Sequence, residues 1–239
     1  MEHVIDVEGL RKNYGGVDAV KDLTLKVRPG RVFGLIGANG AGKTTTIKSL
    51  TGQIRPTSGR VSVLGIDLLK DPVGVRKLVG IIPEQEAPPS FLTGEEYLSF
   101  VCAVRGLKDA ERRASFWFEY LDFEGQKNML CKDLSRGTRQ KLMVAQAFIH
   151  EPNLIFIDEP LVNLDPVIQK KVKDYLTGYA RKGNTVFLCT HILEIVEEIC
   201  DEIAVLDRGV VLSQGPLKEI TGRRHLEDVF LELIGGKHV

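Results

Sequence analysis

A chain of 239 residues with 43% hydrophobic side chains can bury one substantial core with a subdomain, and it is short for two independent enzymes. Basic and acidic residues balance at 32 each, so the overall charge favours neither a polybasic membrane anchor nor a nucleic-acid tract, and we expect no nucleic-acid partner. No apolar stretch approaches the roughly 20 residues that span a bilayer, and the first residues lack the order of a signal peptide. The four cysteines form no C-x-x-C pair, which argues against a zinc site or redox motif. Since neither a membrane span nor a signal peptide is indicated, we expect a cytoplasmic protein.

Strand patterns dominate the first third of the chain. Apolar alternation predicts two half-buried antiparallel strands at 4–7 and 23–27. Short apolar runs predict three more strands at 32–36, 61–64 and 79–82. The spacing of apolar residues then changes to three and four over 94–123, as it does in helices. The residues that recur at this spacing are Tyr97, Leu98, Val101 and Val104 and then Phe116, Trp117, Tyr120 and Leu121.

Helices and strands alternate in the remainder of the chain. The patterns predict a helix, a strand, a helix and a strand in that order, at 136–150, 154–157, 166–181 and 185–189. A hairpin at 203–212 and an amphipathic helix at 225–234 follow them. Such alternation is typical of an α/β fold with a mostly parallel sheet.

A glycine-rich segment with the spacing G-x-x-x-x-G-K-T directly follows the apolar run at 32–36. Glycines allow backbone conformations closed to residues with a Cβ, so successive N–H groups can converge on phosphate oxygens beside a helix N-terminus. Lys43 is expected to reach the outer phosphates and Thr44 to hold Mg²⁺ between the β- and γ-phosphates. A plain glycine-rich turn is the alternative. The residues assigned to nucleotide binding in this loop are Gly37, Asn39, Gly40, Ala41, Gly42, Lys43, Thr44 and Thr45.

Two carboxylates, Asp158 and Glu159, end the apolar run at 154–157. The carboxyl end of a buried strand is where α/β proteins bind ligands. Asp158 suits holding Mg²⁺, and Glu159 suits polarising the water that attacks the γ-phosphate. An exposed acidic turn would be the default interpretation, but the phosphate loop in the same chain favours the functional one.

The order of these motifs resembles the nucleotide-binding subunits of ATP-binding cassette (ABC) transporters over nearly the whole chain. The resemblance implies that Tyr14 stacks on adenine, that Gln85 in the Q-loop touches the metal and the attacking water, and that His191 is the switch histidine at the γ-phosphate. It also places Asp165, at the end of the D-loop segment 163–165, among the nucleotide-binding residues. Taken singly, Tyr14, Gln85 and His191 would each pass for an ordinary loop or core residue.

The signature segment 134–138 departs from the common family form Leu-Ser-Gly-Gly-Gln, because Arg136 and Thr138 stand in its third and fifth places. Ser135 and Gly137 remain, and a hydroxyl with free N–H groups at a helix N-terminus can bind a γ-phosphate. Either the variant is tolerated, or the site is weakened and needs a partner subunit with the regular form. We favour the first, because the following helix continues the family's pattern.

The resemblance implies an ABC ATPase fold. This fold has a P-loop NTPase core with a mostly parallel sheet, an N-terminal antiparallel β subdomain and a helical subdomain inserted at about 86–150. The predicted domain spans 1–222, and a short helical extension covers 223–239. The predicted catalytic residues are Glu159, His191 and Gln85, and the predicted Mg²⁺ ligands are Thr44, Gln85 and Asp158.

The implied function is ATP hydrolysis that powers transport. Two copies are expected to pair head to tail as a homodimer, each ATP lying between the P-loop of one and Ser135 and Gly137 of the other. Separate transmembrane permease subunits are expected as partners, on the cytoplasmic face of the membrane. The sequence at 226–233 and the variant signature resemble exporter subunits of the drug-resistance and ABC-2 type. Two alternatives are a non-transport ABC ATPase acting on ribosomes or DNA, and a nucleotide-binding regulatory module without turnover.

Overall fold

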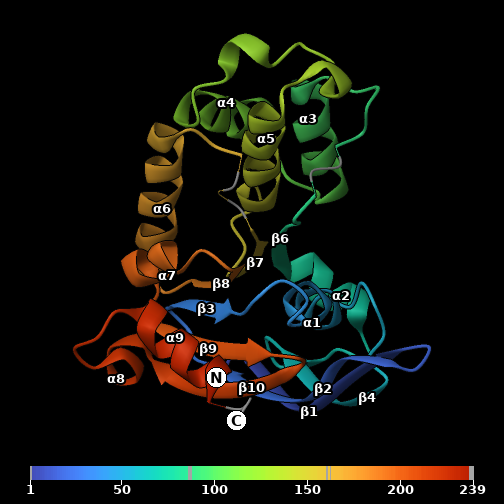
Figure 1. Cartoon of the computed structure of the whole chain (residues 1–239). Helices are drawn as coiled ribbons and strands as arrows, with labels where there is room; N and C mark the ends of the chain where they lie inside the picture. Colours follow the sequence, from blue (N-terminus) through green and yellow to red (C-terminus); the bar gives the residue numbers. More distant parts are fainter. Residues whose placement is uncertain (1, 86–87, 160, 162, 237–239) are drawn as a thin grey trace.

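The computed structural model describes residues 2–85, 88–159, 161 and 163–236. Two β-sheets form its lower half and a group of helices its upper half (Figure 1). The expected ABC ATPase fold is confirmed in both parts: an antiparallel sheet near the N-terminus and a mostly parallel sheet that carries the helices. Residues 86 and 239, where we expected the helical subdomain to begin and the C-terminal extension to end, lie outside the described residues.

The first sheet is antiparallel throughout, in the order β2-β1-β4-β5. Its strands are β1 (Ile5–Tyr14), β2 (Val17–Val27), β4 (Ser58–Val63) and β5 (Ile66–Asp67). One face is apolar and fully buried, as the alternation predicted; Val7, for example, lies between Leu25 and Val61 in the pairing register. β1 and β2 are both longer than predicted, because the polar ends of the hairpin continue the ladder up to Tyr14 and Val17.

The second sheet has the order β10-β9-β3-β8-β7-β6. Its strands are β3 (Val32–Ile36), β6 (Val79–Ile82), β7 (Leu154–Asp158), β8 (Thr185–Thr190), β9 (Glu202–Asp207) and β10 (Val210–Pro216). All neighbours pair in parallel except the β9–β10 hairpin. In this register Ile36 pairs with Thr190, and Asp158 pairs with Cys189. The carboxyl ends of β3, β7 and β8 therefore meet at one edge of the sheet.

Nine α-helices are described: α1 (Lys43–Leu50), α2 (Pro72–Leu78), α3 (Gly94–Val104), α4 (Ala110–Tyr120), α5 (Arg136–Phe148), α6 (Pro166–Arg181), α7 (Leu193–Ile199), α8 (Leu217–Thr221) and α9 (Leu226–Gly235). Two short 3₁₀ turns, η1 (Glu124–Gln126) and η2 (Cys131–Asp133), lie between α4 and α5. The predicted helical block is thus α3 and α4, inserted between β6 and β7 together with α5. No described helix is long and apolar enough to cross a membrane.

The predicted helices of the block are confirmed, but the apolar residues that recur at helical spacing are not all buried. Val104 is 69% exposed and Phe116 is 49% exposed, whereas Ala114 and Phe118, which the pattern left out, are buried. α4 lies against α5 and α6 with Trp117 at the contact, and this crossing rotates the buried face away from Phe116. Helical spacing gives the period of a face but leaves its width open.

Candidate functional site

The phosphate loop joins β3 to α1 and depends on glycine at two positions. Gly42 has φ +108°, and a Cβ there would lie 2.5 Å from the carbonyl oxygen of Ala19. A Cβ on Gly37 would lie 2.4 Å from the carbonyl oxygen of Leu206. The loop therefore fits closely against β2 and β9, and α1 begins directly after it at Lys43.

Lys43 is 93% buried by the loop itself, with 7% of its surface exposed. Its Nζ donates to the carbonyl oxygens of Gly37, at 2.7 Å, and Ala38, at 3.2 Å. The ammonium group thus lies inside the loop, at the start of α1. Carbonyl oxygens are weaker partners for an ammonium group than phosphate oxygens, so Lys43 can exchange them for a nucleotide.

Asp158 ends β7 and is 2% exposed. Burial raises the pKa of its carboxyl to about 6, against the opposing hydrogen bond from Thr44, and the nearby carboxylates of Glu84 and Glu159 raise it further. Its Oδ1 is buried and has no hydrogen-bond partner among the described residues. A buried carboxylate oxygen without a partner beside a hydroxyl is a donor set that fits Mg²⁺.

Glu159 follows Asp158 with the left-handed φ of +51°, and its N–H donates to the carbonyl oxygen of Cys189 at 3.0 Å. Its side chain is held at both oxygens. Oε1 accepts from the backbone N–H of His191 at 3.0 Å and lies 2.7 Å from Nδ1 of the same residue. Oε2 accepts from the hydroxyl of Thr190 at 2.8 Å. Strained backbone that neighbouring elements hold in place is typical of functional sites.

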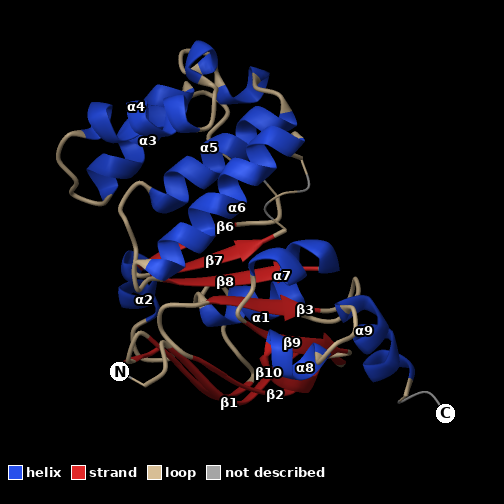
Figure 2. Cartoon of the chain, turned by 90° about the vertical axis from the view of Figure 1, so that its left-hand side faces the viewer, coloured by secondary structure: helices blue, strands red, loops and turns tan. Residues whose placement is uncertain are grey.

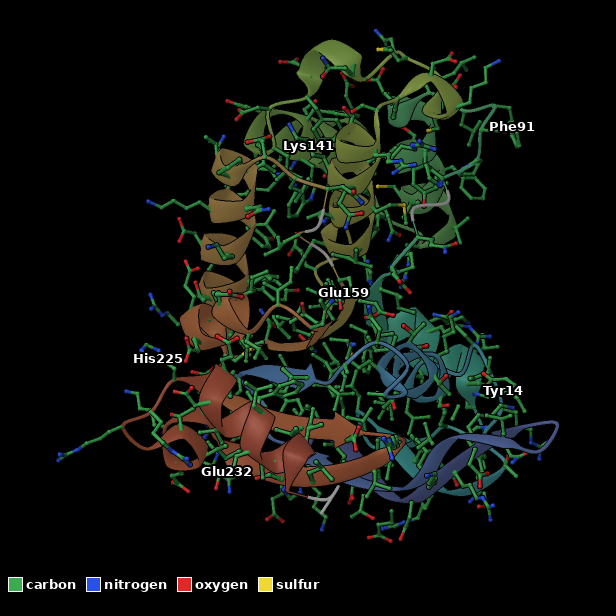
Figure 3. All side chains as sticks on the ribbon, in the orientation of Figure 1. Tyr14, Phe91, Lys141, Glu159, His225 and Glu232 are labelled. Carbon is green, nitrogen blue, oxygen red and sulfur yellow. The ribbon has the colours of Figure 1, made fainter. Side chains whose placement is uncertain are left out.

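A cavity of about 510 Å³ lies at this edge of the parallel sheet. The structure brings together on its walls most of the residues that the sequence assigned to nucleotide and metal: Tyr14, Asn39, Gly40, Gly42, Lys43, Thr44, Thr45, Asp158 and Glu159. Figure 3 shows Glu159 near the centre of the molecule and Tyr14 toward the outer end of the antiparallel sheet. The Tyr14 ring is half-exposed, with Lys12 Nζ 4.8 Å from its centroid. A flat, half-exposed ring on the wall of the cavity that the phosphate loop also lines suits a base.

Gln85 and His191 lie near this cavity without lining it. Gln85 lines an adjoining hollow of about 320 Å³ that shares Thr44 and Asp158 with the cavity. His191 is bound to Glu159, and its side chain is 47% exposed. The structure therefore places both side chains one contact away from the cavity walls.

Three residues at the site were missed by the sequence analysis. Thr190 holds Glu159, and Glu84 and Ala19 line the cavity. The Oε2 of Glu84 lies 3.5 Å from the hydroxyl of Thr44. For Thr190 the signal was its place at the end of β8, next to the β7 carboxylates. Glu84 directly precedes Gln85 in the predicted Q-loop, whereas Ala19 belongs to no recognisable motif.

The signature residues lie elsewhere in the chain. Ser135, Gly137 and Asp165 are not among the described residues that line the cavity or the adjoining hollow. Ser135 caps α5 by accepting from Thr138 N–H at 3.1 Å, and its hydroxyl is 2.9 Å from the Thr138 hydroxyl. Asp165 caps α6 by accepting from two N–H groups at 3.1 Å each, and the Ile168 N–H in particular lowers the pKa of its carboxyl.

Gly137 packs against the D-loop segment, since a Cβ on it would lie 2.9 Å from the carbonyl oxygen of Asn163. The N-termini of α5 and α6 thus form one second cluster, separate from the cavity. The roles of these residues toward a nucleotide stay predictions.

Comparisons with known proteins agree with this architecture. The family model described as "ABC transporter" matches residues 20–162. An ABC transporter ATP-binding protein of Synechocystis sp. is 38% identical over 90% of this chain and 62% of its own length. Nod factor export ATP-binding protein I of Ralstonia nicotianae is 34% identical over 91% of this chain and 68% of its own length. The chain thus spans about two thirds of the length of these relatives.

A solved structure described as the ATP-binding subunit of an ABC transporter superposes with a TM-score of 0.91. It is 33% identical, and the match covers 97% of this chain and 99% of that one. The family model alone matches more than half of the chain. With the phosphate loop, the β7 carboxylates and the two-sheet fold in place, the chain belongs to the ABC transporter family and carries its ATP-binding domain.

Proposed function

We propose that the chain hydrolyses ATP and that two copies, paired head to tail, use this cycle to power export through separate transmembrane subunits. One observation carries the proposal: the phosphate loop, Asp158 and Glu159 converge on one cavity, whereas Ser135 and Gly137 lie outside it. A second copy would supply the missing contacts to the γ-phosphate. ATP would then hold the pair together, and its hydrolysis would let the pair open.

Thr44 and Asp158 would hold Mg²⁺, with Gln85 beside them in the adjoining hollow. The unpartnered, buried Oδ1 of Asp158 supports this assignment. When bound, the ion neutralises charge on the β- and γ-phosphate oxygens. The Glu84 carboxylate lies 3.5 Å from the Thr44 hydroxyl, and this contact would have to break before the hydroxyl binds the ion.

In the chemical step, a water oxygen attacks the γ-phosphorus and the bond to the bridging oxygen of ADP breaks. Glu159 would accept the proton from this water, since its carboxylate lines the cavity in an orientation fixed by Thr190 and His191. Lys43 would move from the carbonyl oxygens of the loop to the phosphate oxygens. ADP and phosphate leave, and the proton returns to solvent.

Substitution of Glu159 tests the enzymatic part. Glu159→Gln should keep ATP binding and lose at least about 10²-fold in hydrolysis, because the amide cannot accept the proton. Glu194→Gln is the matched control, since Glu194 is exposed on α7 and should leave turnover unchanged. Lys43→Ala should weaken ATP binding in calorimetry. Turnover of Glu159→Gln at the control rate would remove Glu159 from the catalytic role.

Export and the membrane partner have separate support. Phe91, Phe100 and Val104 are large apolar side chains that are 54–76% exposed; Phe91, labelled in Figure 3 in the helical half, precedes α3, and the other two lie one turn apart on α3. Such a patch suits docking of a permease on the cytoplasmic face of the membrane. The similarity to a Nod factor export protein favours the exporter class. Co-purification with a membrane protein from detergent extracts would support it, and recovery only with ribosomes or DNA would overturn it.

A further inference from the structure

A second cavity, of about 610 Å³, lies at the amino ends of the parallel strands, away from the carboxyl ends that hold the nucleotide cavity. Its wall includes Asn153, which directly precedes β7, and Asn184, which directly precedes β8. The nucleotide cavity lies at the carboxyl ends of the same strands. In Figure 2 these strands run side by side in one direction, beneath α5 and α6. The two cavities therefore do not share a wall.

The walls of this second cavity are aromatic. Trp117 makes an edge contact with Tyr175, at 4.9 Å between ring centroids, and stacks on Phe148 at 5.6 Å. Phe148 in turn contacts Tyr179 at 5.1 Å. Phe116 also lines the cavity and is half-exposed. The contacts bury Trp117, Phe148 and Tyr179 against one another, so the half-exposed ring of Phe116 lies on a preformed aromatic wall.

The polar groups around the cavity are mostly cationic. The Lys182 side chain forms no hydrogen bond or ion pair with a described residue, and the Arg112 side chain has only an exposed ion pair of 3.7 Å with Asp109. Arg113 is already paired with Glu151 at 2.9 Å. Lys182 and Arg112 thus remain available to a ligand. The acidic residue among the described lining residues, Glu151, is already paired with Arg113.

Tyr175 adds a neutral polar group. Its ring lines the cavity, and its hydroxyl makes no hydrogen bond to any residue that the structure describes. Desolvation by burial raises the pKa of this hydroxyl to about 12, so it stays protonated and can donate.

We propose that this cavity binds a planar aromatic carboxylate. The ring of such a ligand would lie against the half-exposed ring of Phe116, which Trp117 supports by an edge contact of 5.3 Å, and its carboxylate would meet Lys182 and Arg112. Stacking on a preformed aromatic wall and pairing with an unused cation are the two interactions that this site offers. An aliphatic or a neutral ligand could use only one of them.

The place of the cavity connects it to the signature cluster. α5 runs from Ser135 to Phe148, and α6 runs from Asp165 past Tyr175 and Tyr179. A ligand in the cavity would contact the carboxyl-terminal ends of both helices, whose amino-terminal ends hold the signature cluster. Occupancy should therefore change the rate of ATP hydrolysis; this part rests on the proposed function, whereas binding itself does not.

Binding is measured on the nucleotide-free chain. Trp117 is the single tryptophan, so protein labelled with 5-fluorotryptophan gives one ¹⁹F resonance that reports on this cavity. Titration with 2-naphthoate should shift this resonance in a saturable way. Lys182→Ala should weaken binding about fivefold and Phe116→Ala about tenfold. Lys170→Ala changes an exposed lysine of α6, the helix that ends just before Lys182, and Lys170 does not line the cavity; it is the matched control and should bind as the wild type does.

Two results would overturn the site: no saturable shift at millimolar naphthoate, or affinities that Lys182→Ala and Phe116→Ala both leave unchanged. Equal affinity for cyclohexanecarboxylate or for 2-naphthamide would contradict the ligand class. Saturable binding that leaves ATP turnover unchanged would overturn the coupling alone. If the chain hydrolysed no ATP with or without the ligand, that result would count against the proposed function instead.

Discussion

The orientation of Glu159 depends on side chains from the neighbouring strand β8 and the residue after it. Thr190 donates to one carboxylate oxygen, and His191 contacts the other. Glu159 itself carries a left-handed backbone, so these partners hold a conformation that a non-glycine residue rarely takes. The carboxylate is thereby aimed before any nucleotide binds.

Thr190→Val tests this positioning role. The variant keeps the shape of the side chain but loses the hydroxyl, and we expect turnover to fall about tenfold with ATP affinity retained. Thr190→Ser should restore most of the rate, because it restores the donor. Rates of both variants under saturating ATP decide the matter; equal turnover in Thr190→Val and wild type would show that Glu159 needs no such partner.

His150 makes the stability of the fold pH-dependent. Burial, with the nearby Arg105 charge, lowers the pKa of its ring to about 4, and its Nε2 contacts the carbonyl oxygen of Val79 at 3.2 Å. In the unfolded chain the ring titrates near its ordinary pKa of about 6.5. Between these values the unfolded chain binds more protons, so the free energy of unfolding decreases as the pH falls from about 6.5 toward 4.

We expect this loss to amount to roughly 1 kcal/mol, because the ring is only partly buried and solvent screens the full effect. Urea unfolding between about pH 7 and about pH 5 measures it. His150→Gln should flatten the pH dependence in this range. His225→Gln is the control, since the His225 side chain is 87% exposed; identical slopes in the two variants would contradict the assignment.

At the scale of the element, α5 depends on Ser135 for its first turn. The Ser135 hydroxyl accepts from Thr138 N–H, which satisfies one of the unpaired donors at the helix N-terminus. The same hydroxyl is the group that we propose binds the γ-phosphate in the partner's site. A single residue thus combines a structural and a functional role, and two substitutions can separate them.

Ser135→Ala should lower the free energy of unfolding by about 1 kcal/mol and also weaken ATP-driven pairing. Ser135→Asp should recover the stability, because Asp caps helices as well as Ser does, but its charge should repel the phosphate. Thermal unfolding and pairing are measured on both variants. Normal pairing by the stable Ser135→Asp variant would mean that Ser135 does not face the nucleotide.

The elements differ in how far the sequence could predict them. The parallel strands and the longer helices α5, α6 and α9 were predicted to within a few residues, because each has enough residues for a clear period. The helices α2, α7 and α8 were missed; they have seven, seven and five residues, too few for helical periodicity to show. Which residues of α4 are buried could not be read from their spacing, because the contact of α4 with α6 through Trp117 and Tyr175 decides it.

The residues of the candidate site also differ in how far the sequence could predict them. The phosphate loop and the β7 carboxylates could be predicted because their chemistry depends on residues adjacent in the sequence. Thr190 contacts Glu159 across 31 positions, and this contact follows from the pairing of β7 with β8. Glu84 reaches Thr44 across 40 positions through a loop contact that no local pattern encodes.

At the scale of the whole molecule, the two halves of the proposed ATP site lie on different parts of one chain. The cavity at the edge of the sheet holds the phosphate loop and the carboxylates, and the N-termini of α5 and α6 hold Ser135 and Asp165. Figure 1 shows α5 in the helical half, above the sheet that carries the cavity. A second copy in head-to-tail orientation would bring the two halves together.

Sedimentation of the Glu159→Gln variant tests this claim most directly. The variant should bind ATP without hydrolysing it, so saturating ATP with Mg²⁺ should convert it from one chain to a pair. Removal of nucleotide should return it to single chains. A variant that stays a single chain with ATP bound, as calorimetry on the same sample would establish, would contradict the shared site.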